Sequence, residues 1–400
     1  MTVMKQDELM KIYNDDIIRI RRDFHQYPEL GFEEVETTKR IAALLGKWGI
    51  PYTINPEKQT GLVAKISGAR PGKAVALRAD IDALPIHEKT GLPFASKIPG
   101  HMHACGHDNH IAMLLGAARM LLDMKDSLYG DVYLVFQPSE ETGEGARYMM
   151  RFGDWFSRVG AIFGGHIWSS VPAGKIAVRT GPVMAATDQF TIRIHGVQSH
   201  GSQPWSGIDA VVVGSAIVMN LQSIVSRQMH AVDPVVVTVG KFQGGDRWNV
   251  VSGEAVLEGT TRYFRREIGP ELKKRMEQIV EETAKAYGAT AELEYHFLVM
   301  PTINDETCAD IARQAVTEVL GTDALGDTDL IMAGEDFSTY QKEKPGCFVM
   351  VGTYNQDCHA TYPNHSDYFT SDESVLAGGA RVYAQMAMDW LKKQKETKTI

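Results

Sequence analysis

Apolar residues recur at helical spacing directly behind the densest cluster of polar residues in the chain. The apolar positions lie three or four residues apart, at Ile111, Leu114, Leu115, Ala118 and Leu122. This period predicts a buried helix. The preceding stretch, 101–110, contains four histidines, one cysteine and one aspartate. We therefore expect the polar cluster to form a loop at the N-terminus of a buried helix, where the helix dipole stabilises anions and lowers the pKa of a cysteine thiol.

Continuous apolar runs predict buried strands, and several of these strands end in groups that can bind ligands. The runs 73–80, 132–136 and 161–168 are mostly apolar, as expected for strands that are covered on both faces. The groups at or just past their carboxyl ends are acidic or imidazole: Asp80, Asp82, Glu140, Glu141 and His166. Because ligands bind at the carboxyl edge of open α/β sheets, we expect a functional site there.

The pattern changes near residue 187, where apolar and polar residues begin to alternate as in a half-exposed antiparallel strand. The elements that follow have the order β-α-β-β-α-β of a ferredoxin-like unit. The expected fold class is therefore α/β, with a catalytic domain made of a mixed sheet flanked by helices. This domain comprises 1–186 and 300–400, and a ferredoxin-like α+β domain at 187–299 is inserted into it. Because such a sheet has an edge to cover, we expect a homodimer through the inserted domain.

The composition is typical of a globular protein of two or three domains. The 400 residues carry a formal net charge of −9, which disfavours nucleic acid and anionic membrane surfaces as partners. The four cysteines are widely spaced and indicate a reducing compartment rather than a disulfide framework. The N-terminus has no apolar signal core, and no run approaches the ~20 apolar residues of a membrane span. We expect a cytoplasmic protein that binds neither nucleic acid nor membrane.

Sulfur, imidazole and carboxylate groups at five positions are candidate metal ligands. They are Cys105, His107, Glu141, His166 and His365. A buried cysteine with surface histidines is the ordinary alternative, but polar groups at this density are costly to desolvate without an ion. Five ligands are too many for one open tetrahedral site, whereas they suit two ions about 3.5–4 Å apart that share a bridge. The Cys105 thiolate can supply that bridge.

The paired glutamates indicate a division of roles. Glu140 and Glu141 are adjacent, so that one can bind metal while the other takes a proton from metal-bound water as general base. A solvated acidic turn is the alternative. His200, in the inserted domain, could polarise a substrate carbonyl or stabilise an oxyanion, although a surface-loop histidine is the more ordinary interpretation of a single such residue.

Asp80 is a candidate for fixing the orientation of a metal ligand. Histidines that bind metal usually donate their second N–H to a carboxylate, which fixes the tautomer. Asp80 could accept this hydrogen bond from His107, but Asp82 and Asp108 compete for the same role.

Eight stretches, in order from residue 21 to residue 369, resemble the amidohydrolase branch of the two-metal aminoacylase and carboxypeptidase superfamily. They are RRDFHQYPELGFEE, LRADIDALPI, HMHACGHDNHIAMLLGAA, FQPSEETGEGA, GGHIW, NVVSGEAVLEGTTR, AGEDFS and NHSDYF. This branch includes hippurate hydrolases, N-acyl-amino-acid deacylases and the plant indole-acetyl-amino-acid hydrolases. The HACGHD stretch and the paired glutamates are highly specific when they occur together.

The resemblance implies a catalytic domain with a two-metal site and an inserted lid or dimerisation domain. It implies that the five candidate ligands bind the metals and that Glu140, rather than its neighbour, is the general base. It also implies that His200 and Asn249 approach the substrate, from the same subunit or across a dimer. Three positions depart from the usual family pattern without removing a ligand: Asn109, Ser139 and Trp205. The change at Trp205 leaves the substrate preference open.

We therefore expect a metal-dependent amidohydrolase that cleaves the amide bond of N-acyl amino acids or similar small conjugates. Zinc or manganese is expected at the site, with cobalt or nickel as alternatives. The alternatives are a dipeptidase or a carbamoyl-group hydrolase, which would use the same attack of water on a different substituent. The expected small-molecule partner is therefore an N-acyl amino acid or, for the first alternative, a dipeptide. A non-catalytic protein that binds metal or ligand would show no turnover after reconstitution with divalent ions.

Overall fold

A computed structural model describes residues 2–396 of the chain, with the side chains of residues 13–395. The chain forms two compact units. The large unit comprises the chain up to Val183, Ile303–Asp329 and the chain from Asp336 onward, and the inserted unit comprises Met184–Thr302 and Leu330–Glu335. The chain leaves and re-enters the large unit near two short strands, β7 (Gly181–Met184) and β14 (Thr302–Asn304).

The large unit is built on an eight-stranded mixed sheet with the strand order β1-β2-β4-β3-β5-β16-β6-β15. Its strands are β1 (Tyr52–Ile54), β2 (Leu62–Ser67), β3 (Ala74–Asp80), β4 (Asp131–Gln137), β5 (Val159–Pro172), β6 (Ile176–Ala177), β15 (Leu325–Gly326) and β16 (Gly346–Tyr354). The central strands β4, β3, β5 and β16 are parallel, and β2 joins them antiparallel. Every residue of β3 is buried, as its continuous apolar run predicts. The short strand β1 was not predicted.

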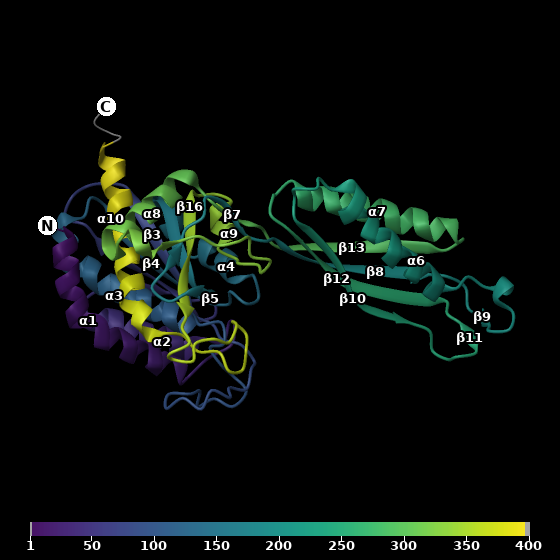
Figure 1. Ribbon diagram of the computed structural model, residues 1–400, viewed down its shortest axis with the longest axis horizontal. Helices are drawn as coiled ribbons and strands as arrows, with labels where there is room; N and C mark the ends of the chain where they lie inside the picture. The colour runs from purple at the N-terminus through teal and green to yellow at the C-terminus, as the bar shows by residue number, and fades with distance from the viewer. Residues whose placement is uncertain (1, 397–400) are drawn as a thin grey trace. The chain divides into compact units, whose positions relative to one another are not determined.

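Helices flank this sheet (Figure 1). They are α1 (Thr2–His25), α2 (Val35–Lys47), α3 (His107–Asp123), α4 (Gly145–Arg151), α5 (Trp155–Arg158), α8 (Glu306–Leu320), α9 (Ser338–Gln341) and α10 (Leu376–Glu396). Helix α3 packs between α1, α10 and the sheet, and its apolar residues are buried as their spacing predicts, except Leu122 near its end, which is partly buried. The sequence pattern did not predict the short helix α9.

The inserted unit is a four-stranded antiparallel sheet with two helices on one face (Figure 1). Its main elements are β8 (Thr187–His195), α6 (Ala210–Ser223), β10 (Val235–Gly244), β12 (Glu254–Tyr263), α7 (Ile268–Ala286) and β13 (Thr290–Val299). The strand order β10-β12-β8-β13 is that of the predicted ferredoxin-like unit. Burial alternates along β8, so that one face of the sheet packs on the helices. The predicted fold class is confirmed.

One helix of the inserted unit is unusually apolar. Residues 210–228, which include α6 and the π-helical turn Ile224–Gln228, are long and apolar enough to span a membrane by length and composition alone. This corrects the expectation that no segment approaches such a length. The core helix of a folded unit passes the same test, and the inner side of α6 packs in the core of the inserted unit. The outward side chains Val212, Met219 and Val225 remain exposed.

Candidate metal centre

The loop before α3 packs closely against β5 and brings Cys105 and His107 beside that strand. Gly106 adopts a left-handed conformation with a φ of 91°, and a Cβ at this position would lie only 2.2 Å from Cδ1 of Ile167. Glycine is therefore required both for the backbone angle and for the close approach. His166 lies level with the end of β3, because Leu77 pairs with Phe163 in the parallel register.

A second loop, which carries His365, is tied to the backbone carbonyls of the first by two hydrogen bonds. The N–H of His365 donates to the carbonyl of Ala104 at 2.8 Å, and the side-chain amide of Asn364 donates to the carbonyl of Cys105 at 3.1 Å. His365 itself adopts a left-handed φ of 70°. These bonds explain how residues that are 260 positions apart in the sequence meet.

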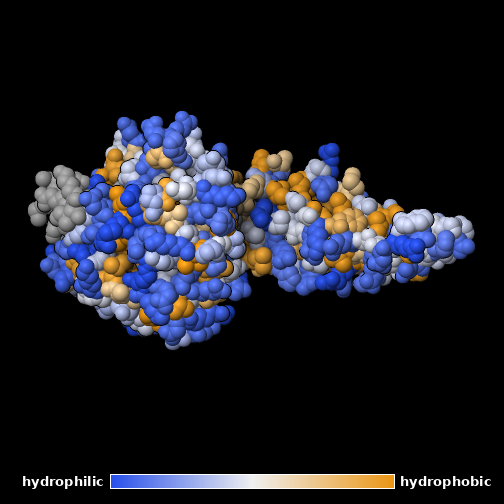
Figure 2. Space-filling view, turned by 90° about the horizontal axis from the view of Figure 1, so that it is seen from below, coloured by the Kyte–Doolittle hydropathy of each residue, from blue (hydrophilic) through white to orange (hydrophobic). Residues whose placement is uncertain are grey.

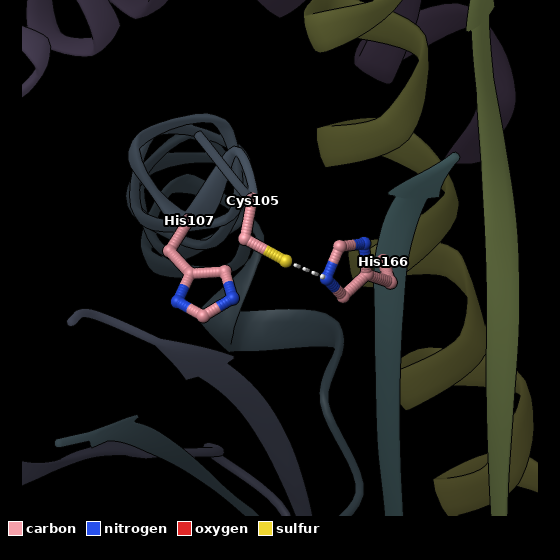
Figure 3. A group of neighbouring side chains, drawn as sticks. All are labelled: Cys105, His107 and His166. Atoms are coloured by element: carbon pink, nitrogen blue, oxygen red, sulfur yellow. Dashed lines mark hydrogen bonds between the residues drawn. The ribbon is translucent and has the colours of Figure 1, made fainter. Parts of the chain in front are cut away.

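The five predicted metal ligands lie together around the sulfur of Cys105. The Sγ atom lies 3.2 Å from Nε2 of His166 (Figure 3) and 3.2 Å from Nε2 of His365. The ligand atoms form two groups, each with all atoms within 4.8 Å: one of Cys105, His107 and His166, the other of Cys105, Glu141 and His365. The sulfur belongs to both groups, as a bridge between two ions would require.

The imidazoles of His107 and His166 are oriented for metal binding. Nδ1 of His107 donates to Oδ1 of Asp82 at 3.1 Å, and Nδ1 of His166 donates to the carbonyl of Ile167 at 2.6 Å. Each hydrogen bond fixes the tautomer in which Nε2 carries the lone pair. Nε2 of His107 is buried and has no hydrogen-bond partner among the described residues. A buried polar atom is costly to leave unsatisfied, and Nε2 of the neutral ring has a lone pair that can bind a cation.

The electrostatic environment also fits a cation. Burial raises the pKa of the Cys105 thiol well above its usual value, and the neighbouring carboxylates of Glu141, Glu140 and Asp80 raise it further. The expectation of a lowered pKa is therefore wrong for the metal-free protein, because burial and carboxylates outweigh the helix dipole. Burial lowers the pKa of His107, but the carboxylates of Asp80 and Asp82 outweigh burial and raise it to about 10. A bound divalent cation would reverse this balance and deprotonate the thiol.

Asp82, rather than Asp80, accepts the hydrogen bond from Nδ1 of His107. Its second oxygen, Oδ2, accepts the N–H of Glu141 at 3.0 Å, so that one carboxylate holds two candidate ligands. Asp80 lies on the other side of the ring, with Oδ2 at 3.7 Å from Nε2 of His107. Its own partners are Arg78 at 2.7 Å and Nδ1 of His110 at 2.5 Å. The third candidate, Asp108, instead bonds to His25 at 2.8 Å.

Glu140 lies beside the ligands in a nearly closed environment. Its carboxylate belongs to a further group of close atoms with His107 and Glu141, and its exposed fraction is 9%. Its Oε1 accepts the N–H of Asp336 at 3.4 Å. The Asp336 carboxylate is in turn held by the buried Arg78 at 3.0 Å. Sequence reasoning missed Arg78 and Asp336, although a charged residue inside a buried strand was a signal.

His200 and Asn249 lie next to each other in the inserted unit. His200 is the last residue of β9 (Ser199–His200), which pairs with β11 (Val250–Val251), and the N–H of Gly201 donates to the carbonyl of Asn249 at 2.8 Å. The His200 side chain is exposed, and its Nδ1 accepts the N–H of Ser202 at 3.1 Å. The expected approach of His200 and Asn249 to a substrate stays a prediction.

The site has a sulfur that two ligand groups share and a carboxylate beside them that can move protons. These features are typical of metal-dependent hydrolases with a two-metal site. Comparison with known proteins identifies the family. The pattern of Peptidase family M20/M25/M40 matches residues 76–389, and the chain belongs to this family. The predicted superfamily and the predicted enzyme class are confirmed.

Named relatives cover almost the whole chain. The N-acetylcysteine deacetylase of Bacillus subtilis is 40% identical over 379 residues, which are 94% of this chain and 97% of the relative. Thermostable carboxypeptidase 1 of Saccharolobus solfataricus is 39% identical over 95% of this chain and 96% of the relative. An IAA-amino acid hydrolase of Arabidopsis thaliana is 38% identical over 95% of this chain and 87% of the relative.

Solved structures agree with this assignment. The YXEP protein of Bacillus subtilis, described as a dinuclear metal binding peptidase from the M20 family, has a TM-score of 0.85 at 37% identity and covers 96% of this chain and 99% of its own. A structure from methicillin resistant Staphylococcus aureus has a TM-score of 0.92 at 34% identity, with 97% of this chain and all of its own covered. Together with the two ligand groups, these likenesses support a two-metal site.

Replacing Cys105 with alanine should impair both metal positions, because its sulfur belongs to both ligand groups. After reconstitution and desalting, we expect about two bound ions per chain in the wild-type protein and less than about one in Cys105→Ala. Elemental analysis measures the bound metal. Cys358→Ala is the matched control, because Cys358 is an exposed free cysteine outside the site. Retention of two ions per chain by Cys105→Ala would show that the sulfur is not a shared ligand.

Proposed function

We propose that this protein is an amidohydrolase that cleaves the amide bond of N-acyl amino acids or similar small conjugates. The observation that carries the proposal is the convergence of four ligand side chains on the sulfur of a fifth, Cys105, with the Glu140 carboxylate beside them. Two relatives that are about 40% identical bear names of the same substrate class, a deacetylase of N-acetylcysteine and a hydrolase of IAA-amino acids.

The proposed ligands divide between two positions. His107 and His166 would hold one ion and Glu141 and His365 the other, with Cys105 shared between them. Sulfur and imidazole donors suit zinc, while the carboxylate suits manganese, and cobalt or nickel remain alternatives. The His365 side chain is 53% exposed, so that this side of the site is open to solvent and to a substrate.

The chain's own residues account for proton movement and orientation. Bound divalent ions would acidify a water molecule and polarise the scissile carbonyl. Glu140 takes the proton of the attacking water and returns it to the leaving amine. We assign to Asp82 the orienting role that the sequence suggested for Asp80, because Asp82 holds Nδ1 of His107. Asp80 instead neutralises Arg78 and orients His110.

We also propose that His200 and Asn249 contact the substrate. Their support is the motif resemblance and their adjacency at β9 and β11. An imidazole N–H and a side-chain amide are suitable donors for a carbonyl oxygen that gains negative charge in the transition state. Oδ1 of Asn249 is buried without a hydrogen-bond partner among the described residues.

Replacing the proposed base should separate catalysis from metal binding. We expect Glu140→Gln to retain both ions and to lower kcat by about 10²–10⁴-fold, because glutamine cannot accept the proton. Reconstituted protein is assayed by the release of amine from N-acyl amino acids. Glu144→Gln, an exposed position in the same turn, is the control and should keep wild-type turnover. Hydrolysis by Glu140→Gln at the wild-type rate would refute the assignment of the base.

The substrate class can be tested on metal-loaded wild-type protein. We expect higher kcat/KM for acetyl- and benzoyl-amino acids than for dipeptides or carbamoyl amino acids. A dipeptidase is the second candidate, because a relative that is 39% identical is named a carboxypeptidase. Faster release of amino acids from dipeptides than from acyl conjugates would favour that candidate over the proposed one.

We further propose that the protein is a cytoplasmic homodimer, assembled through the inserted unit. Strand β10 is at one edge of its sheet, and such an edge favours pairing with another strand. Helix α6 exposes Met219 at 70% and Val212 at 49%. Figure 2 shows hydrophobic side chains, in orange, on the surface of the inserted unit at the right of the picture. Exposed apolar surface of this kind is typical of an interface.

A charge on α6 should disrupt this dimer. We expect light scattering to give about twice the chain mass for the wild-type protein and about the chain mass for Met219→Glu, because the carboxylate would have to be buried in the interface. Gln278→Glu, at an exposed position of α7, should leave the dimer intact. A wild-type protein that is monomeric at all concentrations tested would contradict the proposal.

A further inference from the structure

The turn that carries Glu140 and Glu141 begins with a residue in an unfavourable backbone conformation. Ser139 has a φ of 58°, in the left-handed region that residues other than glycine rarely adopt. This conformation determines the directions in which the next two side chains leave the backbone. Something outside the turn must hold Ser139 there, because an unconstrained serine would prefer a negative φ.

A carboxyl group from a distant loop supplies that constraint. Oε1 of Glu34 accepts the N–H of Ser139 at 2.7 Å, although the two residues are 105 positions apart. The Glu34 residue is fully buried, and its Oε2 has no hydrogen-bond partner among the described residues. The loop of Glu34 also touches the turn at Gly31, where a Cβ would lie 2.7 Å from Oγ of Ser139.

The same loop is fastened to the segment that holds the candidate ligands. The N–H of Ala83 donates to the carbonyl of Glu29 at 2.8 Å, and Leu30 forms a bridge with Ala83. Asp82, the residue before Ala83, accepts the N–H of Glu141 at 3.0 Å. The two hydrogen bonds to the turn, one at each side of Glu140, therefore come from two segments that are joined to each other.

We propose that Glu34 is a positioning residue for catalysis, whose carboxyl oxygen holds the backbone of Ser139 so that Glu140 faces the reaction while Glu141 faces the metal. This inference rests on the proposed function of the two glutamates. Burial, together with the nearby charge of Asp82, raises the pKa of Glu34 to about 8. In the metal-free protein this favours the neutral carboxylic acid near neutral pH, and glutamine offers a carbonyl oxygen at the same reach to accept the N–H of Ser139.

The chain provides a matched control within the same loop. The Glu29 carboxylate also accepts a backbone N–H at 2.7 Å, from Thr37, and a second one at 3.2 Å, from Glu36. These bonds hold the N-terminus of α2 and not the turn of Glu140. If the loss of kcat in Glu34 variants came only from losing a hydrogen bond in this loop, Glu29 variants should therefore lose kcat to the same extent.

The experiment compares Glu34→Leu, Glu34→Gln, Glu34→Asp and Glu29→Leu as metal-loaded proteins. We expect Glu34→Leu to lower kcat per loaded chain by about 10–10²-fold with little change in KM, because small displacements of a catalytic group cost this much. Glu34→Gln keeps the acceptor in place and should stay within about threefold of wild type. Glu34→Asp keeps the carboxyl group but retracts the acceptor and should resemble Glu34→Leu. Glu29→Leu should lower the Tm and leave kcat unchanged.

A second measurement does not depend on activity. In the metal-free proteins, we expect faster backbone hydrogen exchange at residues 139–145 in Glu34→Leu and Glu34→Asp, but not in Glu34→Gln or Glu29→Leu. Wild-type kcat in Glu34→Leu, or a loss of kcat in Glu29→Leu of the same size, would overturn the proposal. If Glu34→Leu does not fold, a higher kcat in Glu34→Asp than in Glu34→Gln would overturn it. If the wild-type protein hydrolyses no amide, the proposed function fails, whereas the exchange result still tests the role of Glu34.

Discussion

The structure depends on the concentration of negative and electron-donating groups in a buried space around one sulfur atom. Three carboxylates, from Asp80, Glu140 and Glu141, raise the pKa of the Cys105 thiol and so oppose its ionisation, and a fourth, from Asp82, holds His107. Such an arrangement is unfavourable in a medium of low dielectric unless cations compensate it. The site therefore fits divalent ions. The surrounding structure holds the donor groups in place although their charges repel one another.

Buried hydrogen bonds from several segments provide that restraint. Asp82 orients His107 and the backbone of Glu141. Arg78 joins Asp80, on the same strand β3, to Asp336 in the turn before α9. Glu34 reaches the turn of the paired glutamates from the loop between the first two helices. Because most of these bonds are buried, replacing one partner should shift the positions of the site's side chains while leaving the side chains themselves in place.

The inserted unit differs from the large unit in how it is packed. Its sheet is packed on one face only, and its helix α6 leaves apolar side chains in solvent. The large unit holds the groups that the hydrolysis of any amide would need. The residues proposed to contact the substrate, His200 and Asn249, belong to the inserted unit, together with the exposed Trp205. Relatives with differently named substrates share nearly the full length of the chain, so that differences among them must arise from side chains within one common fold.

The sequence by itself determined the main elements, the ferredoxin-like order of the inserted unit and the positions of the five candidate ligands. These features depend on local periodicity and on side-chain chemistry at neighbouring positions, such as Cys105 with His107 and Glu140 with Glu141. Only the tertiary structure decided that Asp82 rather than Asp80 holds Nδ1 of His107. The two aspartates are the same residue type at the end of β3 and just after it, and the sequence does not show the direction of either side chain. It also decided the raised pKa of Cys105 and the contact of Glu34 with Ser139, because burial and contacts between distant segments exist only after the chain has folded.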